Sequence, residues 1–140
     1  SVNMVVNKYN WESVAETIQY VKNNPAIESI SINFYTPFPD AENLMITRKQ
    51  REEVIDTVIR MKREGYPIMN SISGLRLMKH NRFKRRCWVT NFIYADHKRA
   101  NCAGEELGIC SDCGLCMAGE MNAVFNFCLD TILAGLKLRL

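Results

Sequence analysis

Apolar and polar positions divide the first 80 residues into short runs with strand character and longer segments with helical spacing. Three runs are short, apolar and rich in β-branched residues, and they predict strands at residues 1–7, 29–35 and 66–70. The segments between and after them have apolar residues along one helical face, and they predict helices at residues 10–22, 47–64 and 73–80. This alternation is typical of βαβ units, so it predicts an α/β fold with a parallel sheet. The strands are apolar on both faces, which predicts that helices cover both faces of that sheet.

Capping and stop signals indicate where the two longer helices begin and end. Asn10 is a plausible N-cap for the first helix. Thr47 and Gln50 have the spacing of a capping box, which opens the second helix. Gly65 follows that helix at the position where glycine commonly ends helices.

Polar residues follow each of the three predicted strands. In parallel α/β folds, ligands bind at the carboxyl ends of the strands, so these residues are candidates for a binding site. The alternative is that Asn and Ser at these positions only cap turns. The candidates are Asn7, Asn33, Tyr35, Asn70 and Ser71.

Three strands do not close a barrel, because an eight-unit barrel needs about 250 residues. Residues 1–82 are therefore expected to form βα units of an open sheet or of a partial TIM-type barrel. Residues 83–140 are expected to form a second unit, which is rich in cysteine. The basic run at residues 79–86 predicts a solvated linker between the two, with contact to phosphates as the alternative.

Composition favours a globular protein and argues against other classes. Hydrophobic residues make up 47% of the chain and charged residues 24%, which suits a packed core. The net charge of +3 is too small to indicate nucleic-acid binding. No apolar run approaches the roughly 20 residues that span a bilayer, and no secretory leader is visible, so we expect a cytoplasmic protein without a membrane partner.

All six cysteines lie after residue 86, and their spacing predicts a metal site. Residues 88–94 have strand character and residues 95–98 form a polar turn, so a β-hairpin with a cysteine at each end of its mouth is expected. Three further cysteines follow with two residues between neighbours, a spacing that suits thiolate ligands. One centre needs four ligands, and we expect the first two cysteines with two of the next three. The candidate ligands are Cys87, Cys102, Cys110, Cys113 and Cys116.

Zinc and iron–sulfur clusters both accept four thiolates. A zinc ribbon needs two CxxC pairs, whereas this chain has one pair extended by a further cysteine, which favours an iron–sulfur cluster and keeps structural zinc as the alternative. Cys128 lies in an apolar stretch and is expected to be a buried free thiol. The tail from Asp130 to Leu140 is expected to pack as a helix or a strand.

The spacing Cys87-x9-His97-x4-Cys102 resembles the C-x(9–15)-G-x4-C hairpin that opens the SPASM or twitch module of radical S-adenosylmethionine proteins, with His97 in place of glycine. The later cysteines depart from the full SPASM pattern, so a single-cluster, twitch-like site is the better match. The resemblance implies an auxiliary [4Fe–4S] cluster, preceded by the later βα units of a partial TIM-type barrel. It also implies that the polar residues after the strands face S-adenosylmethionine and an unknown substrate.

The radical chemistry of this family needs a CxxxCxxC motif, and none occurs in these 140 residues. The resemblance therefore implies the C-terminal half of such an enzyme, which would be inactive alone and would bind S-adenosylmethionine only with the N-terminal barrel half as its partner. The alternative function is a structural zinc module on an α/β fragment, with a binding or scaffold role.

Overall fold

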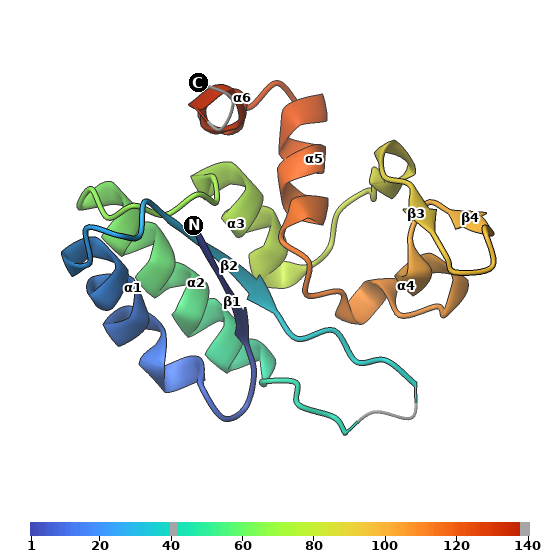
Figure 1. Cartoon of the computed structure of the whole chain (residues 1–140), viewed down its shortest axis with the longest axis horizontal. Coiled ribbons are helices and arrows are strands. Elements are labelled where there is room, and N and C mark those ends of the chain that lie inside the picture. The colour runs from blue at the N-terminus through green and yellow to red at the C-terminus, as the bar shows by residue number, and fades with distance from the viewer. Residues whose placement is uncertain (40–41, 138–140) are drawn as a thin grey trace.

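The computed structural model describes residues 1–39 and 42–137, and these have a mixed α/β fold (Figure 1). The first part of the chain contains β1 (Val2–Val6), the 3₁₀ turn η1 (Trp11–Ser13), α1 (Val14–Asn23), β2 (Ile30–Phe34), α2 (Arg48–Arg63) and α3 (Ile72–His80). The second part contains η2 (Cys87–Val89), β3 (Phe92–Ile93), β4 (Arg99–Ala100), α4 (Ala103–Glu106), η3 (Cys110–Asp112), α5 (Met117–Phe125) and α6 (Leu129–Lys137).

β1 and β2 pair in parallel along their whole length, as predicted. The third predicted strand, residues 66–70, was wrong in extent, because within the described part of the chain it forms one parallel bridge, between Ile30 and Ile68. A side chain takes the place of further pairing. The amide oxygen of Asn70 accepts from the N–H of Ile32 at 2.7 Å, and its amide nitrogen donates to the Ile32 carbonyl at 3.0 Å.

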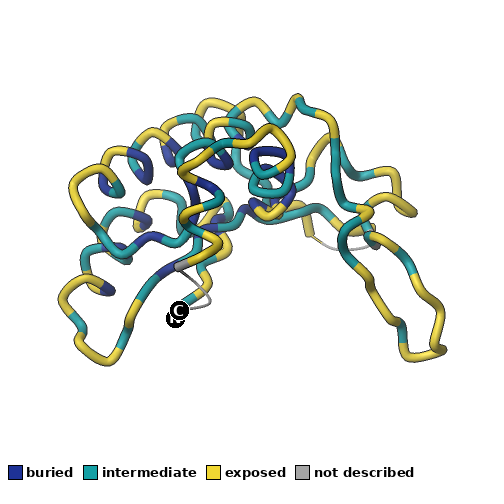
Figure 2. Tube along the Cα trace, turned by 90° about the horizontal axis from the view of Figure 1, so that it is seen from above, coloured by how far each residue is buried: buried dark blue, intermediate teal, exposed yellow. Residues whose placement is uncertain are grey.

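Helices gather on one side of the two strands, as Figures 1 and 2 show. Ile30, Ile32 and Phe34 of β2 are buried in one hydrophobic cluster with Ile18 of α1 and Ile55 of α2. Alternate residues of β2 therefore point into this core, which is the period that a pleated strand requires.

The opposite face of the sheet is polar and partly exposed. The amide oxygen of Asn3 accepts from the hydroxyl of Ser31 at 2.9 Å and from the amide of Asn33 at 2.8 Å. Val5, on the same face, is 44% exposed. The strands are thus apolar on one face only, which corrects the expectation that both faces would be covered by helices.

The predicted helix starts were right for α2 and shifted for α1. Gln50 donates its backbone N–H to the Thr47 hydroxyl at 3.3 Å and accepts the Thr47 N–H at 2.8 Å, which completes the capping box. Asn10 does not cap α1, because a 3₁₀ turn comes first and α1 begins at Val14. The Asn10 side chain instead accepts from the N–H of Asn7 at 2.8 Å.

The second part of the chain contains the predicted hairpin, but with shorter strands. β3 and β4 pair antiparallel over two residues each, and the segment from Cys87 to Val89 is a 3₁₀ turn rather than strand. The tail forms α6 as far as Lys137, and residues 138–140 lie outside the described part. No helix in the described part is long and apolar enough to cross a membrane.

α5 and α6 pack against the first part of the chain, and a carboxylate from each accepts hydrogen bonds at the N-terminus of α3. Glu120 of α5 accepts from the N–H of Ser71 at 2.8 Å and from its hydroxyl at 2.5 Å. Asp130 of α6 accepts from the N–H and the hydroxyl of Ser73 at 2.9 and 2.7 Å. Two carboxylates therefore satisfy amides that a helix N-terminus otherwise leaves unpaired, so the cysteine-bearing part is fixed to the helical body.

The expectation of a buried Cys128 was wrong. Cys128 is half-buried, and its neighbours Phe127 and Leu129 are 82% and 74% exposed. The apolar stretch is not a core segment because it turns between α5 and α6, where Phe127 has a φ of 56°.

Candidate metal centre

Four of the six cysteines line one cavity of about 270 Å³ beside the hairpin. Cys87 lies in η2, Cys102 follows β4, Cys110 opens η3 and Cys113 ends it. Three segments of the chain thus contribute thiols to one space. The other lining residues are Thr36, Phe38, Arg85, Phe92, Gly104, Ile109 and Leu115.

The hairpin positions the first two of these cysteines. The Thr90 hydroxyl donates to the carbonyl of Cys87 at 2.7 Å and also contacts the carbonyl of Asn101, which joins the two ends of the hairpin. Cys87 and Cys102 therefore lie at its mouth, as the sequence predicted.

His97 lies in the hairpin turn with a φ of 64°, in the left-handed region. This conformation favours glycine, because glycine has no Cβ to clash with the backbone. The resemblance noted above has glycine at this position, so the structure gives a physical reason for that preference. His97 is exposed, and the turn closes through its N–H, which donates to the Tyr94 carbonyl at 2.9 Å.

Close backbone contact fixes the Cys110–Cys116 segment against the end of β2. The N–H of Phe34 donates to the Gly114 carbonyl at 2.8 Å, and the N–H of Gly114 donates to the Thr36 hydroxyl at 2.9 Å. A Cβ on Gly114 would lie 1.9 Å from the Phe34 carbonyl oxygen, so only glycine fits. Two residues further, the N–H of Cys116 donates to the Asn33 side chain at 2.8 Å.

Arg85 brings positive charge to the cavity wall. It donates to the Asn81 side chain at 2.7 Å and to the Cys110 carbonyl at 2.6 Å, and its guanidinium stacks on Phe83 at 4.2 Å. Its Nη1 is buried without a hydrogen-bond partner among the described residues. Burial raises the pKa of the Cys87 and Cys110 thiols, while the charge of Arg85 opposes that rise.

The basic run that contains Arg85 is not simply a solvated linker, which corrects the prediction. Arg86 is also half-buried, and its guanidinium lies 5.3 Å from the ring of Phe125. The Lys84 carbonyl accepts from the Asn122 side chain at 2.6 Å. Sequence reasoning missed Arg85 as part of the site, although its position two residues before the first cysteine was a usable signal.

Cys116 lies apart from the other four candidate ligands. Its side chain is 1% exposed within the main hydrophobic core and borders a different cavity, of about 370 Å³. Burial raises the pKa of this thiol to about 12, so it is neutral at physiological pH. The structure therefore brings Cys87, Cys102, Cys110 and Cys113 together and leaves Cys116 outside the set.

The five polar residues after the strands do not form one cluster. Asn33 and Asn70 both line the 370 Å³ cavity, while the Ser71 hydroxyl caps α3 by accepting the N–H of Gly74 at 2.9 Å. Asn7 accepts from the N–H of Tyr9 at 2.9 Å, as in an Asx turn. The Tyr35 hydroxyl donates to the Glu42 carbonyl at 2.8 Å. Each of the five thus has a hydrogen-bonding role within the fold.

Four thiols are a donor set that zinc and iron–sulfur clusters both accept. Among the described residues, no three His, Cys, Asp or Glu side chains converge closely enough to hold one metal ion. The four cysteines and Arg85 line one space of about 270 Å³.

No family model matches this chain, and no curated protein or solved structure matches it either. The site itself is therefore the basis on which a function is assigned.

Proposed function

We propose that this chain holds a [4Fe–4S] cluster through Cys87, Cys102, Cys110 and Cys113, as the auxiliary-cluster module of a radical S-adenosylmethionine protein. The observation that carries the proposal is the largely apolar cavity that these four cysteines line together. A cluster bound there would supply one-electron transfer and a covalent brace for the fold. Because four thiols leave no iron without a protein ligand, electron relay is favoured over direct binding of substrate to iron.

The residues around the cavity are suited to a negatively charged, buried group. Arg85 contributes a guanidinium next to the thiols, which favours their ionised form. In the metal-free chain, burial keeps the Cys87 and Cys110 thiols protonated, so loading of metal releases protons. The apolar lining residues exclude water, and solvent exclusion is one of the factors that set the potential of such clusters.

The arrangement of the first part supports the finer proposal of βα units from a partial barrel. The parallel order runs from β1 to β2 to Ile68, which is also the order along the chain. Helices cover one face of this sheet, while its other face carries polar side chains, as the inner wall of a barrel with a ligand site would. Within the described residues β1 pairs with β2 alone, so its outer edge is available to a further strand.

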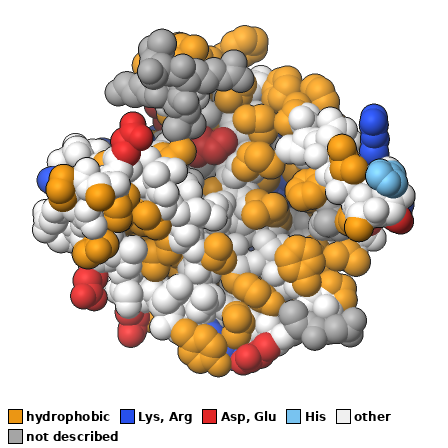
Figure 3. Space-filling model, in the orientation of Figure 1, with side chains coloured by type: hydrophobic (Ala, Val, Ile, Leu, Met, Phe, Trp, Pro, Cys, Tyr) orange, Lys and Arg blue, Asp and Glu red, His pale blue; other side chains and the backbone are white. Residues whose placement is uncertain are grey.

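We propose that the partner at this edge is the N-terminal barrel half that carries the CxxxCxxC motif. Figure 3 shows hydrophobic side chains gathered across the middle of the exposed face. Leu129, Leu133 and Leu136 lie on one side of α6 and are each more than half exposed. Apolar surface of this kind marks contact with another protein segment. S-adenosylmethionine and the substrate would bind only to the combined barrel.

The first test is anaerobic reconstitution of the chain with iron and sulfide, followed by metal analysis and absorption spectroscopy. We expect about four irons and four sulfides per chain and a broad band near 400 nm. Ala variants of Cys87, Cys102, Cys110 and Cys113 should each lose most of the iron. Ala variants of Cys116 and Cys128 are the matched controls and should retain it, because neither thiol lines the cavity.

Structural zinc is the outcome that would replace this proposal. A colourless protein with one zinc per chain, no iron, and zinc loss on mutation of the same four cysteines would assign a structural zinc module. Iron retained in all four Ala variants would refute the ligand assignment.

A further inference from the structure

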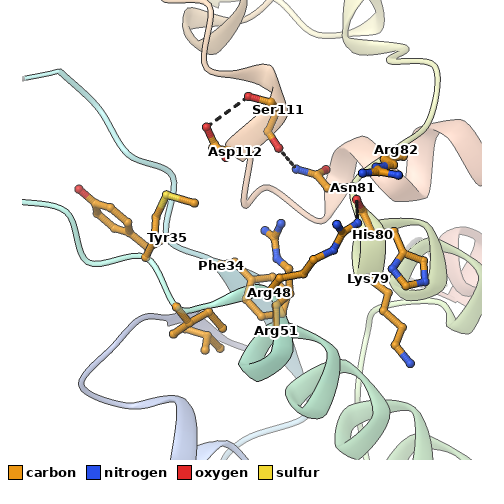
Figure 4. Close-up of a pocket in the computed structure, with 13 residues that line it drawn as sticks. Phe34, Tyr35, Arg48, Arg51, Lys79, His80, Asn81, Arg82, Ser111 and Asp112 are labelled. Carbon is orange, nitrogen blue, oxygen red and sulfur yellow. Dashed lines mark hydrogen bonds between the residues drawn. The ribbon is translucent and has the colours of Figure 1, made fainter.

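A third cavity, of about 400 Å³, lies between the start of α2, the end of α3 and η3 (Figure 4). It shares no lining residue with the four-cysteine cavity. Its lining residues include three arginines, Arg48, Arg51 and Arg82, together with Lys79 and His80. Asp112 is the carboxylate among the lining residues, and it accepts from the Ser111 hydroxyl at 3.2 Å.

Some of these side chains already have carboxylate partners. Lys79 contacts both carboxylate oxygens of Asp56 at 2.8 Å. Arg48 and His80 share Glu52, at 3.7 and 3.3 Å. The other two arginines, Arg51 and Arg82, take part in none of these pairs.

Arg51 and Arg82 have no carboxylate within ion-pair distance in the part of the chain that the structure describes. Arg51 is half-buried, with its guanidinium stacked on Phe34 at 4.6 Å and one hydrogen bond to the Cys113 carbonyl at 3.0 Å. Its other guanidinium nitrogens have no protein partner among those residues. A desolvated cation is costly unless an anion offsets it, and burial lowers the pKa of Arg51 accordingly.

One part of the wall is apolar, with Val6, Phe34, Met45 and Ile46, and the remaining lining residues are Tyr35, Asn81 and Ser111. The cavity therefore presents two different surfaces, one cationic and one hydrophobic, within a volume at the lower end of the range for small-molecule sites. The first turn of α2 contains no acidic residue, so the helix dipole adds to the positive potential.

We propose that this cavity binds a small organic phosphate, with the phosphate between Arg51 and Arg82 and the organic part on the apolar wall. Guanidinium groups match a phosphate because their planar N–H pairs reach two oxygens at once. A phosphate dianion also offsets two positive charges, which a single carboxylate does not. The lining residues of this cavity are separate from those of the cysteine cavity, so phosphate binding can be measured without a bound cluster.

The test is a titration of the chain with phenyl phosphate, observed by ³¹P NMR and calorimetry, with inorganic phosphate and benzoate as comparison probes. We expect Arg82→Glu to weaken binding of phenyl phosphate by about tenfold or more. Arg76→Glu is the matched control, because Arg76 is exposed on α3 and does not line the cavity. It makes the same change in net charge and should alter the affinity by less than about twofold. Arg51→Lys keeps the charge but loses the planar fork, and it should weaken binding several-fold.

Four results would overturn the proposal or part of it. Absence of binding to the unmodified chain at millimolar phenyl phosphate would remove the site. Equal weakening by Arg82→Glu and Arg76→Glu would show general electrostatic attraction instead of a cavity. Benzoate bound as tightly as phenyl phosphate would assign the cavity to carboxylates. Inorganic phosphate bound as tightly as phenyl phosphate would overturn the assigned role of the apolar wall.

Discussion

Replacement of Gly114 by Ala tests how the cysteine segment is held against the sheet. A Cβ at this position would lie 1.9 Å from the carbonyl oxygen and 2.4 Å from the carbonyl carbon of Phe34. Both atoms belong to the backbone of β2, so no side-chain rotation relieves the contact. The segment must therefore move away from the strand.

The magnitude follows from the hydrogen bonds that this movement breaks. Gly114 accepts from Phe34 at 2.8 Å and donates to Thr36 at 2.9 Å, and the N–H of Cys116 donates to Asn33 at 2.8 Å. A net contribution of roughly 1 kcal/mol for each bond gives a loss of about 3 kcal/mol in the free energy of unfolding. Cys113 moves with the segment, so iron retention should also fall.

Urea denaturation followed by circular dichroism measures the loss. Gly135→Ala is the matched control, because no atom of the described residues lies within 4 Å of a Cβ built there and its φ is not positive. Alanine in a helix interior is more favourable than glycine by about 1 kcal/mol, so this control should be neutral or stabilising. A Gly114→Ala chain within about 0.5 kcal/mol of the unmodified chain would refute the close-contact argument.

Three further predictions concern single side chains. His97→Gly should raise the free energy of unfolding by about 0.5–1 kcal/mol in urea titrations, because a φ of 64° is strained for histidine. A loss of stability would show that the His97 side chain contributes contacts. Burial raises the pKa of Glu120, so the folded chain binds that proton more tightly than the unfolded chain, and stability falls as pH rises from about 4.5 through the folded pKa. Glu120→Gln should therefore lose less stability between pH 5 and pH 8 than the unmodified chain does, and an identical pH dependence would contradict this. At pH 8, iodoacetamide should label Cys116 far more slowly than Cys128, because the Cys116 thiol is buried with a pKa of about 12. Equal labelling rates, measured by mass spectrometry, would contradict the burial of Cys116.

Much of the first part could be predicted because local signals agreed with the tertiary structure. The capping box at Thr47 and the apolar periodicity of α2 both describe interactions within one segment. The third strand could not be predicted in the same way. Residues 66–70 have strand composition, but the side chain of Asn70 pairs with Ile32, 38 residues earlier, and that long-range contact leaves no local pattern.

The candidate metal centre was predictable in its residue types but not in its exact members. Cys-x2-Cys-x2-Cys spacing gives three equivalent candidates, and the choice depends on where the chain turns next. Because Cys116 opens α5, which packs on α3, its thiol enters the main core, whereas Cys110 and Cys113 stay on the hairpin side. Arg85 was missed because a basic run is usually solvated, and only the fold shows that Arg85 lines the same cavity as the four cysteines.

The contacts of the Cys110–Cys116 segment link the thiol cavity to the carboxyl ends of the strands. The Gly114 carbonyl accepts from the N–H of Phe34 at the end of β2. Arg51, at the start of α2, donates to the Cys113 carbonyl and also lines the 400 Å³ cavity. One side of this short segment therefore faces the thiols and the other side faces the arginines. A phosphate that draws Arg51 into the cavity would compete for the bond to Cys113. We expect occupancy of that cavity to shift the reduction potential of the proposed cluster, and a redox titration with and without phenyl phosphate measures the coupling. An unchanged potential at saturating phenyl phosphate would show that Arg51 serves the two sites independently.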